Sequence, residues 1–140
     1  MPRELTSHKV NELNESIYVG VIDEPGQGGA CHVYNLAPMV AIDIPDDSAF
    51  DGVVRRMVPV EDANVIIRFQ NGPIKEAGVN GVSQEALLAI VEDRLSCFQS
   101  GPYATRENAV ALTKVQEAMM WLHKRTRDRM ARGVEGTHKK

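Results

Sequence analysis

The stretch that decides the fold is SQEALLAIVEDRLSCFQSGPYATRENAVALTKVQEAMMWLHKRTRDRMARGVEGT, which spans residues 83–137. Apolar residues recur at helical spacing on both sides of a Ser-Gly-Pro break at residues 100–102, so the pattern predicts two helices. Ser83 and Thr105 are typical N-cap residues, and Gly133 is a natural C-terminal stop. Helices joined by so short a break pack antiparallel, as a hairpin. We therefore expect a helical hairpin whose long apolar seam favours oligomerisation.

Five upstream segments are apolar or β-branched and are bounded by turn residues, which predicts strands. They cover residues 16–22, 30–36, 39–44, 53–58 and 64–70. Short connections favour an antiparallel meander over parallel crossovers. The polar N-terminal segment, residues 1–15, is expected to be loosely ordered. The sequence thus predicts an α+β protein in one compact domain, with a β-rich region over residues 1–82 and a helical hairpin over residues 83–140.

Charge is distributed unevenly along the chain. The formal net charge is −3, yet Lys124 to Lys140 contains seven Lys and Arg against two acids and carries +5, which leaves −8 elsewhere. An acidic chain repels long polyanions, so this balance argues against general nucleic-acid binding. The basic segment suits a small anion better. Two cysteines without C-x-x-C spacing, and no apolar run of leader or membrane-spanning type, favour a cytosolic protein without membrane attachment.

Three arginines fall on one face near the end of the second predicted helix, namely Arg125, Arg129 and Arg132. Guanidinium groups at this spacing, followed by a glycine-rich turn, provide the fixed donors and the close backbone approach that a phosphate-bearing ligand needs. The alternative is a solvated stripe with an internal ion pair to Asp128. Arginines at a helix C-terminus also stabilise the helix dipole, which is a structural role.

Phe98 and Asn108 lie on the two sides of the helix break. Phe98 would face the second helix, where it either packs in the core or stacks on a nucleobase. Asn108 is either an ordinary helix-start residue or a reader of a base edge. For both residues the pattern alone favours the structural interpretation.

The sequence contains no conventional catalytic or metal-binding set. The four histidines lack metal-ligand spacing, and Cys31 and His32 are neighbours on a predicted strand, so their side chains point to opposite faces. The glycines at 26, 28 and 29 precede a strand rather than a helix, which argues against a dinucleotide fingerprint. From its residues alone, the chain is interpreted as a binder of small anions, with no catalytic residue, metal or cofactor.

The chain carries several ordered motifs, namely FQNGPIKE (69–76), GVNG (78–81), DRL (93–95), FQ (98–99), ENA (107–109), RTRDR (125–129) and RGVEGT (132–137). Together they resemble the hairpin domain shared by two families of phage proteins, the Thoeris anti-defence sponges and the anti-CBASS cyclic-nucleotide sponges, over about residues 83–137. Two upstream segments, GGACH at 28–32 and NGP at 71–73, resemble the β-rich part found only in the Thoeris type.

The resemblance implies capture of a signal without catalysis. Such proteins bind glycocyclic ADP-ribose signals made by TIR-domain proteins, and some members also bind cyclic trinucleotides at a separate site, in dimers arranged as a hexamer. It implies that Phe98 stacks on the adenine, that Asn108 hydrogen-bonds the ligand, and that Arg125 contacts the phosphates or stacks opposite the base. Further expected contacts of glycocyclic ADP-ribose are Arg129, Gly28 and Gly29, and those of a cyclic trinucleotide are Arg132, Gly136, Thr137 and His138.

The resemblance also implies a location in the cytoplasm of the infected bacterial host. Two other functions stay open at this point. One is an enzyme that cleaves such a signal through His32 or His123, and the other is a phage protein whose basic hairpin binds nucleic acid or a partner helix. The fate of the ligand distinguishes the first, and a steep salt dependence distinguishes the second.

Overall fold

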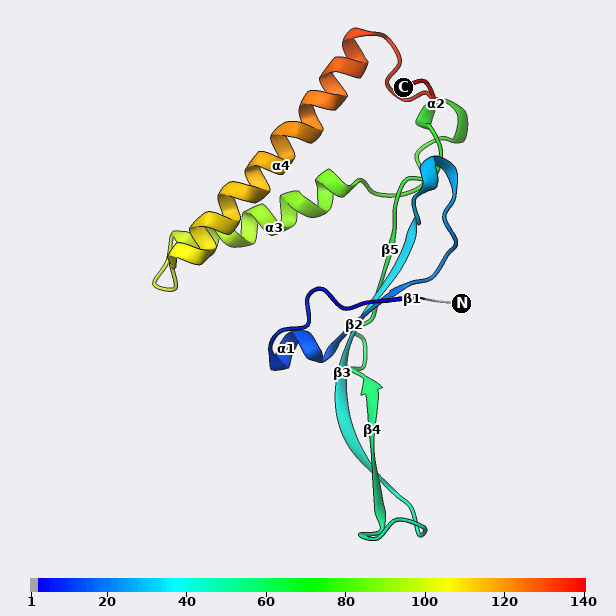
Figure 1. The fold of residues 1–140 in the computed structure, drawn as a ribbon, viewed down its shortest axis with the longest axis vertical. Coiled ribbons are helices and arrows are strands. Elements are labelled where there is room, and N and C mark those ends of the chain that lie inside the picture. The colour runs from blue at the N-terminus through cyan, green and yellow to red at the C-terminus, as the bar shows by residue number, and fades with distance from the viewer. Residues whose placement is uncertain (1–2) are drawn as a thin grey trace. The chain divides into compact units, whose positions relative to one another are not determined.

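Strands fill most of the first half of the chain and helices the second half (Figure 1). The computed structural model describes residues 3–140, except for the side chain of Gln27. This order confirms the predicted α+β class. The elements are β1 (Arg3–Leu5), α1 (Glu12–Glu15), β2 (Ile17–Val21), the 3₁₀ turn η1 (Gln27–Gly29), β3 (Val33–Pro45), β4 (Val53–Pro59), β5 (Val65–Arg68), α2 (Ile74–Ala77), α3 (Gln84–Gln99) and α4 (Arg106–Ala131).

The chain divides into two compact units, residues 1–68 and residues 69–140. The first holds the five-stranded sheet, and the second holds α2 and the helical hairpin. The division therefore assigns the segment 69–82 to the same unit as the hairpin, whereas the boundary predicted from the sequence lies after residue 82.

The strand pairs are antiparallel, as the short connections predict. The order is β1-β2-β3-β4, and β5 pairs with β3 rather than with β4. A simple meander is therefore wrong in this respect. The reason is the length of β3, whose residues 33–36 pair with β5 while residues 39–45 pair with β4.

The two strands expected over residues 30–36 and 39–44 form the single strand β3. Pro38 lacks a backbone donor, but its carbonyl accepts from the Val60 N–H at 2.8 Å, and the Met39 N–H donates to the Ser16 carbonyl at 2.7 Å. Because the Pro38 carbonyl and the Met39 N–H both remain hydrogen-bonded, the proline does not end the strand. It supplies an acceptor where no donor is required.

The N-terminal segment carries more structure than expected. β1 pairs with β2, with Arg3 opposite Val21. The Asn11 side chain caps α1 by accepting from the Asn14 N–H. Pairing at a sheet edge uses backbone groups, so a short polar segment can add a strand without an apolar pattern.

The hydrophobic core of the sheet unit is small and lies where β2 pairs with β3, around Val21 and Ala37. Beyond it, β3 and β4 continue as a two-stranded ribbon (Figure 1). Apolar side chains on this ribbon, among them Val40, Ile42 and Met57, are exposed, as is Phe50 in its end loop.

The hairpin begins and ends where the sequence predicts. Ser83 accepts from the Ala86 N–H at the start of α3, and Thr105 accepts from the Asn108 N–H at the start of α4. The Gln99 side chain bonds both the N–H and the carbonyl of Thr105, which closes the turn. Gly133, at a φ of 72°, follows the C-cap of α4. These contacts confirm the predicted caps and stop.

Candidate functional site

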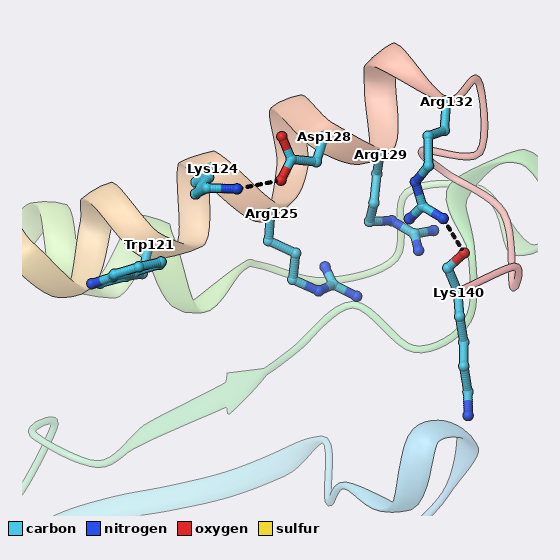
Figure 2. Close-up of a pocket in the computed structure, with 7 residues that line it drawn as sticks. All are labelled: Trp121, Lys124, Arg125, Asp128, Arg129, Arg132 and Lys140. Carbon is cyan, nitrogen blue, oxygen red and sulfur yellow. Dashed lines mark hydrogen bonds and ion pairs between the residues drawn. The ribbon is translucent and has the colours of Figure 1, made fainter.

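The C-terminal half of α4 forms one side of a hollow of about 470 Å³ (Figure 2). Successive turns of the helix bring an aromatic ring and several cations to this side, because residues three and four positions apart share a helix face. We call this cavity the α4 hollow. It is lined by Trp121, Lys124, Arg125, Asp128, Arg129, Arg132 and Lys140.

Arg125 presents an unpaired cation to the α4 hollow. Within residues 3–140 its guanidinium has no hydrogen bond or ion pair, and Figure 2 shows it extending away from the helix. Asp128, predicted to pair with one of the arginines, pairs with Lys124 instead, at 2.7 Å. Both members of that pair are exposed, so its contribution to stability is small. The consequence for the site is that the donors of Arg125 stay open.

Trp121 lies one turn before Arg125 and is 70% exposed. Figure 2 shows its indole ring on the side of α4 from which Arg125 also extends. An exposed indole beside an unpaired guanidinium can receive the flat face of a base while the cation meets a phosphate. The sequence analysis missed this residue. Its position four residues before Arg125 was the signal that would have placed it on the same face.

Arg129 differs sharply from Arg125, although it lies one turn further along the same face. It is only 7% exposed. Its guanidinium donates to the Glu135 carboxylate at 3.0 Å and to three backbone carbonyls, those of Val134, Thr137 and Lys139. These bonds use the donors that the sequence analysis assigned to a ligand.

The four residues predicted to contact a trinucleotide lie together in the turn that follows α4. An Arg132 Nη1–H donates to the Lys140 carbonyl at 2.7 Å, and the Thr137 hydroxyl donates to the carbonyl of Val134. The Gly136 carbonyl accepts from the Lys75 N–H at 3.0 Å, and His138 Nδ1 lies 2.7 Å from a carboxylate oxygen of Glu76. The last two contacts join the turn to α2.

Phe98 and Asn108 lie at the opposite end of α4 from Arg125. At roughly 1.5 Å per residue, Asn108 and Arg125 are about 26 Å apart along the helix axis. Phe98 ends α3 and is 41% exposed, with the Arg94 guanidinium 5.6 Å from its ring centroid. A single chain therefore does not bring Phe98 or Asn108 together with Arg125.

Gly28 and Gly29 lie in the sheet unit, in the loop between β2 and β3. Their φ angles are 79° and 80°, and no atom lies within 4 Å of where a Cβ would stand. Asp23 holds this loop by accepting from the N–H groups of His32 and Val33. Burial acts to raise the pKa of the Asp23 carboxyl, but the two N–H donors hold its pKa below the ordinary value. The loop thus presents an open glycine backbone.

Within residues 3–140, no group of three or more His, Cys, Asp or Glu side chains is placed to hold a metal ion. Cys31 and Cys97 are free thiols. In the same described part of the chain, none of the helices combines the length and the apolar character needed to cross a membrane.

The site is thus an aromatic and cationic hollow at one end of a helical hairpin. Residues 61–127 match the Acb2/Tad1 hairpin domain. This stretch is similar to that domain, so the family resemblance predicted from the sequence is confirmed.

A relative described as Thoeris anti-defense 1, from Bacillus phage SBSphiJ7, is 55% identical over 74 residues. The matched part covers 53% of this chain and 52% of the relative, so the comparison spans about half of each protein.

Proposed function

We propose that this protein is a phage anti-defence sponge, which binds a cyclic nucleotide immune signal and holds it without cleaving it. The observation that carries the proposal is the unpaired guanidinium of Arg125 beside the exposed ring of Trp121, in a hollow of about 470 Å³. That volume lies in the range of small-molecule sites. The hairpin-domain match and the relative's anti-defence description support the same reading.

The ligand we propose is glycocyclic ADP-ribose, the signal made by TIR proteins in Thoeris defence. Arginine binds phosphate through charge-assisted, often bidentate hydrogen bonds. Stacking on an aromatic ring adds roughly 1–3 kcal/mol per base. Arg125 and Trp121 supply one of each, and they are close enough on one helix face to act on the same ligand.

We further propose that two copies of the chain complete this site. Phe98 and Asn108 are expected to contact the adenine end of the ligand, yet Asn108 lies about 26 Å from Arg125 along α4, at roughly 1.5 Å per residue, and Phe98 lies near the end of α3. A second copy can bring its own Phe98 and Asn108 to the Arg125 of the first. Exposed apolar side chains on the hairpin, such as Ile90 and Met120, support pairing between copies as a dimer, arranged further as a hexamer.

A second ligand, a cyclic trinucleotide of CBASS defence, is proposed for the turn after α4. Arg132, Gly136, Thr137 and His138 are close together there, and within residues 3–140 Arg132 uses only one of its guanidinium donors. Gly28 and Gly29 remain proposed contacts of the first ligand from the sheet unit. In this account the protein acts in the cytoplasm of the infected host.

The test is capture and release. Purified protein is mixed with glycocyclic ADP-ribose, unbound nucleotide is removed, the protein is heat-denatured, and the released nucleotide is identified by chromatography. Depletion followed by recovery of unchanged nucleotide is the expected result. A new product would show that the protein is an enzyme rather than a sponge. No depletion of the nucleotide at protein concentrations above about 10 micromolar would contradict the proposed ligand.

A salt series is the control that tests whether the protein instead binds long nucleic acid. Binding of long nucleic acid through Lys and Arg weakens steeply with the logarithm of salt concentration, whereas capture of a small ligand with few phosphates weakens much less. The same protein is therefore assayed with duplex DNA and with glycocyclic ADP-ribose across a salt series. Tighter binding to DNA than to the nucleotide would contradict the proposal.

A further inference from the structure

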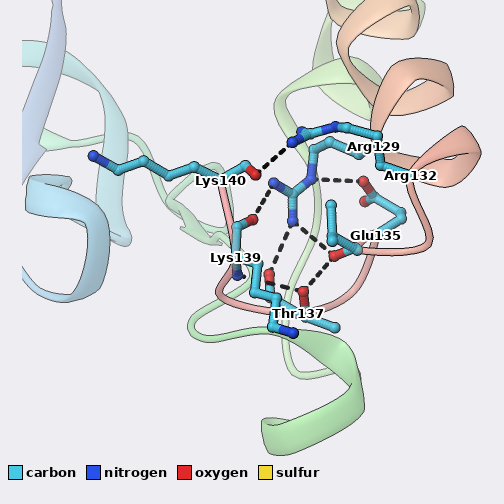
Figure 3. A network of polar contacts seen from close by, with 7 residues as sticks. Arg129, Arg132, Glu135, Thr137, Lys139 and Lys140 are labelled. Atoms are coloured by element: carbon cyan, nitrogen blue, oxygen red, sulfur yellow. Dashed lines mark hydrogen bonds and ion pairs between the residues drawn. The ribbon is translucent and has the colours of Figure 1, made fainter.

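The best-enclosed charge in the hairpin unit belongs to Arg129. Its side chain is 9% exposed, and Figure 3 shows the guanidinium surrounded by the chain that follows α4. The bonds reach residues five to ten positions further along, namely Val134 (3.0 Å), Glu135 (3.0 Å), Thr137 (2.9 Å) and Lys139.

A buried guanidinium is stable only when its charge and its donors are satisfied, because desolvation of an ion is costly. Here one carboxylate balances the charge and three carbonyls accept from the two Nη groups. If residues 134–139 moved away, the cation would lose these partners at the same moment. The geometry therefore couples the conformation of the whole C-terminal segment to this one side chain.

The segment held by Arg129 carries part of the α4 hollow. Its last residue, Lys140, lines the hollow and accepts a hydrogen bond from Arg132 at 2.7 Å. On the other side, the turn is fixed against α2, where a Cβ added to Gly136 would lie 3.0 Å from Ile74 Cγ1. The hydrogen bond from Arg132 to the Lys140 carbonyl thus exists only while the segment stays folded back.

We infer that Arg129 is the positioning residue of the turn after α4, the proposed site of the cyclic trinucleotide. Its bonds fold residues 134–139 back along the guanidinium, and this holds Thr137 and His138 in that turn. The ligand part of this inference rests on the proposed function. A lysine at this position would keep the charge but not the planar fork that reaches four acceptors, so Arg129→Lys removes the positioning without removing the cation.

The first test needs no ligand. Hydrogen exchange is measured on the full chain for the wild type, Arg129→Lys and the matched control Arg127→Lys, whose side chain is exposed on the same helix. The Val134, Thr137 and Lys75 amides, which are hydrogen-bonded in or to the turn, should exchange at least tenfold faster in Arg129→Lys alone. Equal exchange in the two variants would overturn the inference.

The second test separates positioning from contact. Affinities for cyclic tri-AMP and for glycocyclic ADP-ribose are measured for Arg129→Lys, Arg132→Ala and the double variant. We expect Arg129→Lys to weaken the binding of cyclic tri-AMP at least tenfold and the binding of glycocyclic ADP-ribose less than threefold. When Arg132→Ala is already present, adding Arg129→Lys should weaken the binding of cyclic tri-AMP by less than a further threefold. Both changes remove the same contact between Arg132 and the ligand.

Additive losses in the double variant would mean that Arg129 contacts the ligand itself, and equal losses for both ligands would mean a general effect on the fold. Either result overturns the inference. If the wild type binds no cyclic tri-AMP, the proposed second site fails, and the exchange measurement alone then decides whether Arg129 holds the segment.

Discussion

Two glycine-containing turns of this protein are held by opposite means. In the sheet unit, the Asp23 carboxylate collects the backbone N–H groups of His32 and Val33. In the hairpin unit, the Arg129 guanidinium collects backbone carbonyls of residues 134–139. Each turn is thus held by one charged side chain, which gathers backbone groups of the opposite polarity.

The glycines of the two turns differ in the same way. Gly28 and Gly29 have left-handed φ angles and open space around them. Gly136 has a similar φ of 80°, but Ile74 and Lys75 lie against it. The first turn thus needs glycine for its backbone angle alone, and the second needs it also for close packing.

The largest effect on stability is expected when the cation of the second turn is removed. Arg129→Ala should lower the free energy of unfolding of the hairpin unit by about 2–3 kcal/mol, below the full cost of breaking a buried pair because Glu135 is partly exposed. Urea unfolding followed by circular dichroism measures it. The control is Arg132→Ala, which loses one exposed bond and should change stability by less than about 0.5 kcal/mol. Equal losses would remove the distinction between the two arginines.

A smaller effect is expected from a methyl group in the second turn. Gly136→Ala and Gly133→Ala both place an alanine in a left-handed backbone, at a cost of about 1–2 kcal/mol. Only Gly136→Ala also meets Ile74, at 3.0 Å, and should lose about 1 kcal/mol more. Thermal unfolding of the two variants tests this difference. Identical melting temperatures would show that the turn does not pack on α2 as described.

The first turn should respond to pH, and its effect is the smallest. Because the folded-state pKa of Asp23 is lowered, its charge adds stability above the ordinary value of 3.8, and this stability is lost as pH falls through the lower folded value. Asp23→Asn should therefore lower the melting temperature at pH 6, and the difference from the wild type should shrink below pH 3.8. A difference that stays constant with pH would contradict the role of the charge.

Much of the fold could be predicted because its signals are local. Ser83, Thr105 and Gly133 act through bonds to residues a few positions away, so the helix ends follow from the sequence. The continuity of β3 through Pro38 could not be predicted in this way. It depends on the hydrogen bond from Val60, a residue distant in the sequence, to the Pro38 carbonyl. The edge strand β1 has no apolar pattern to reveal it.

The arrangement of the arginines could be predicted only in part, for the same reason. Helical spacing places Arg125 and Arg129 on one face, but it cannot say which of them the following chain encloses. That depends on the fold-back after Gly133, which turns Arg129 into a buried group and leaves Arg125 open. The same spacing places Trp121 on this face, four residues before Arg125.

The central claim is that Arg125 binds the ligand beside Trp121, and Trp121 is the only tryptophan of the chain. The decisive measurement is therefore a titration of tryptophan fluorescence with glycocyclic ADP-ribose, for the wild type, Arg125→Ala and the matched control Arg127→Ala. A hydrogen bond to a charged group contributes roughly 1.5–3 kcal/mol, so Arg125→Ala should weaken binding about tenfold to a hundredfold. Arg127→Ala should match the wild type. Equal affinities for the two variants, or a fluorescence that does not respond to the nucleotide, would contradict the account.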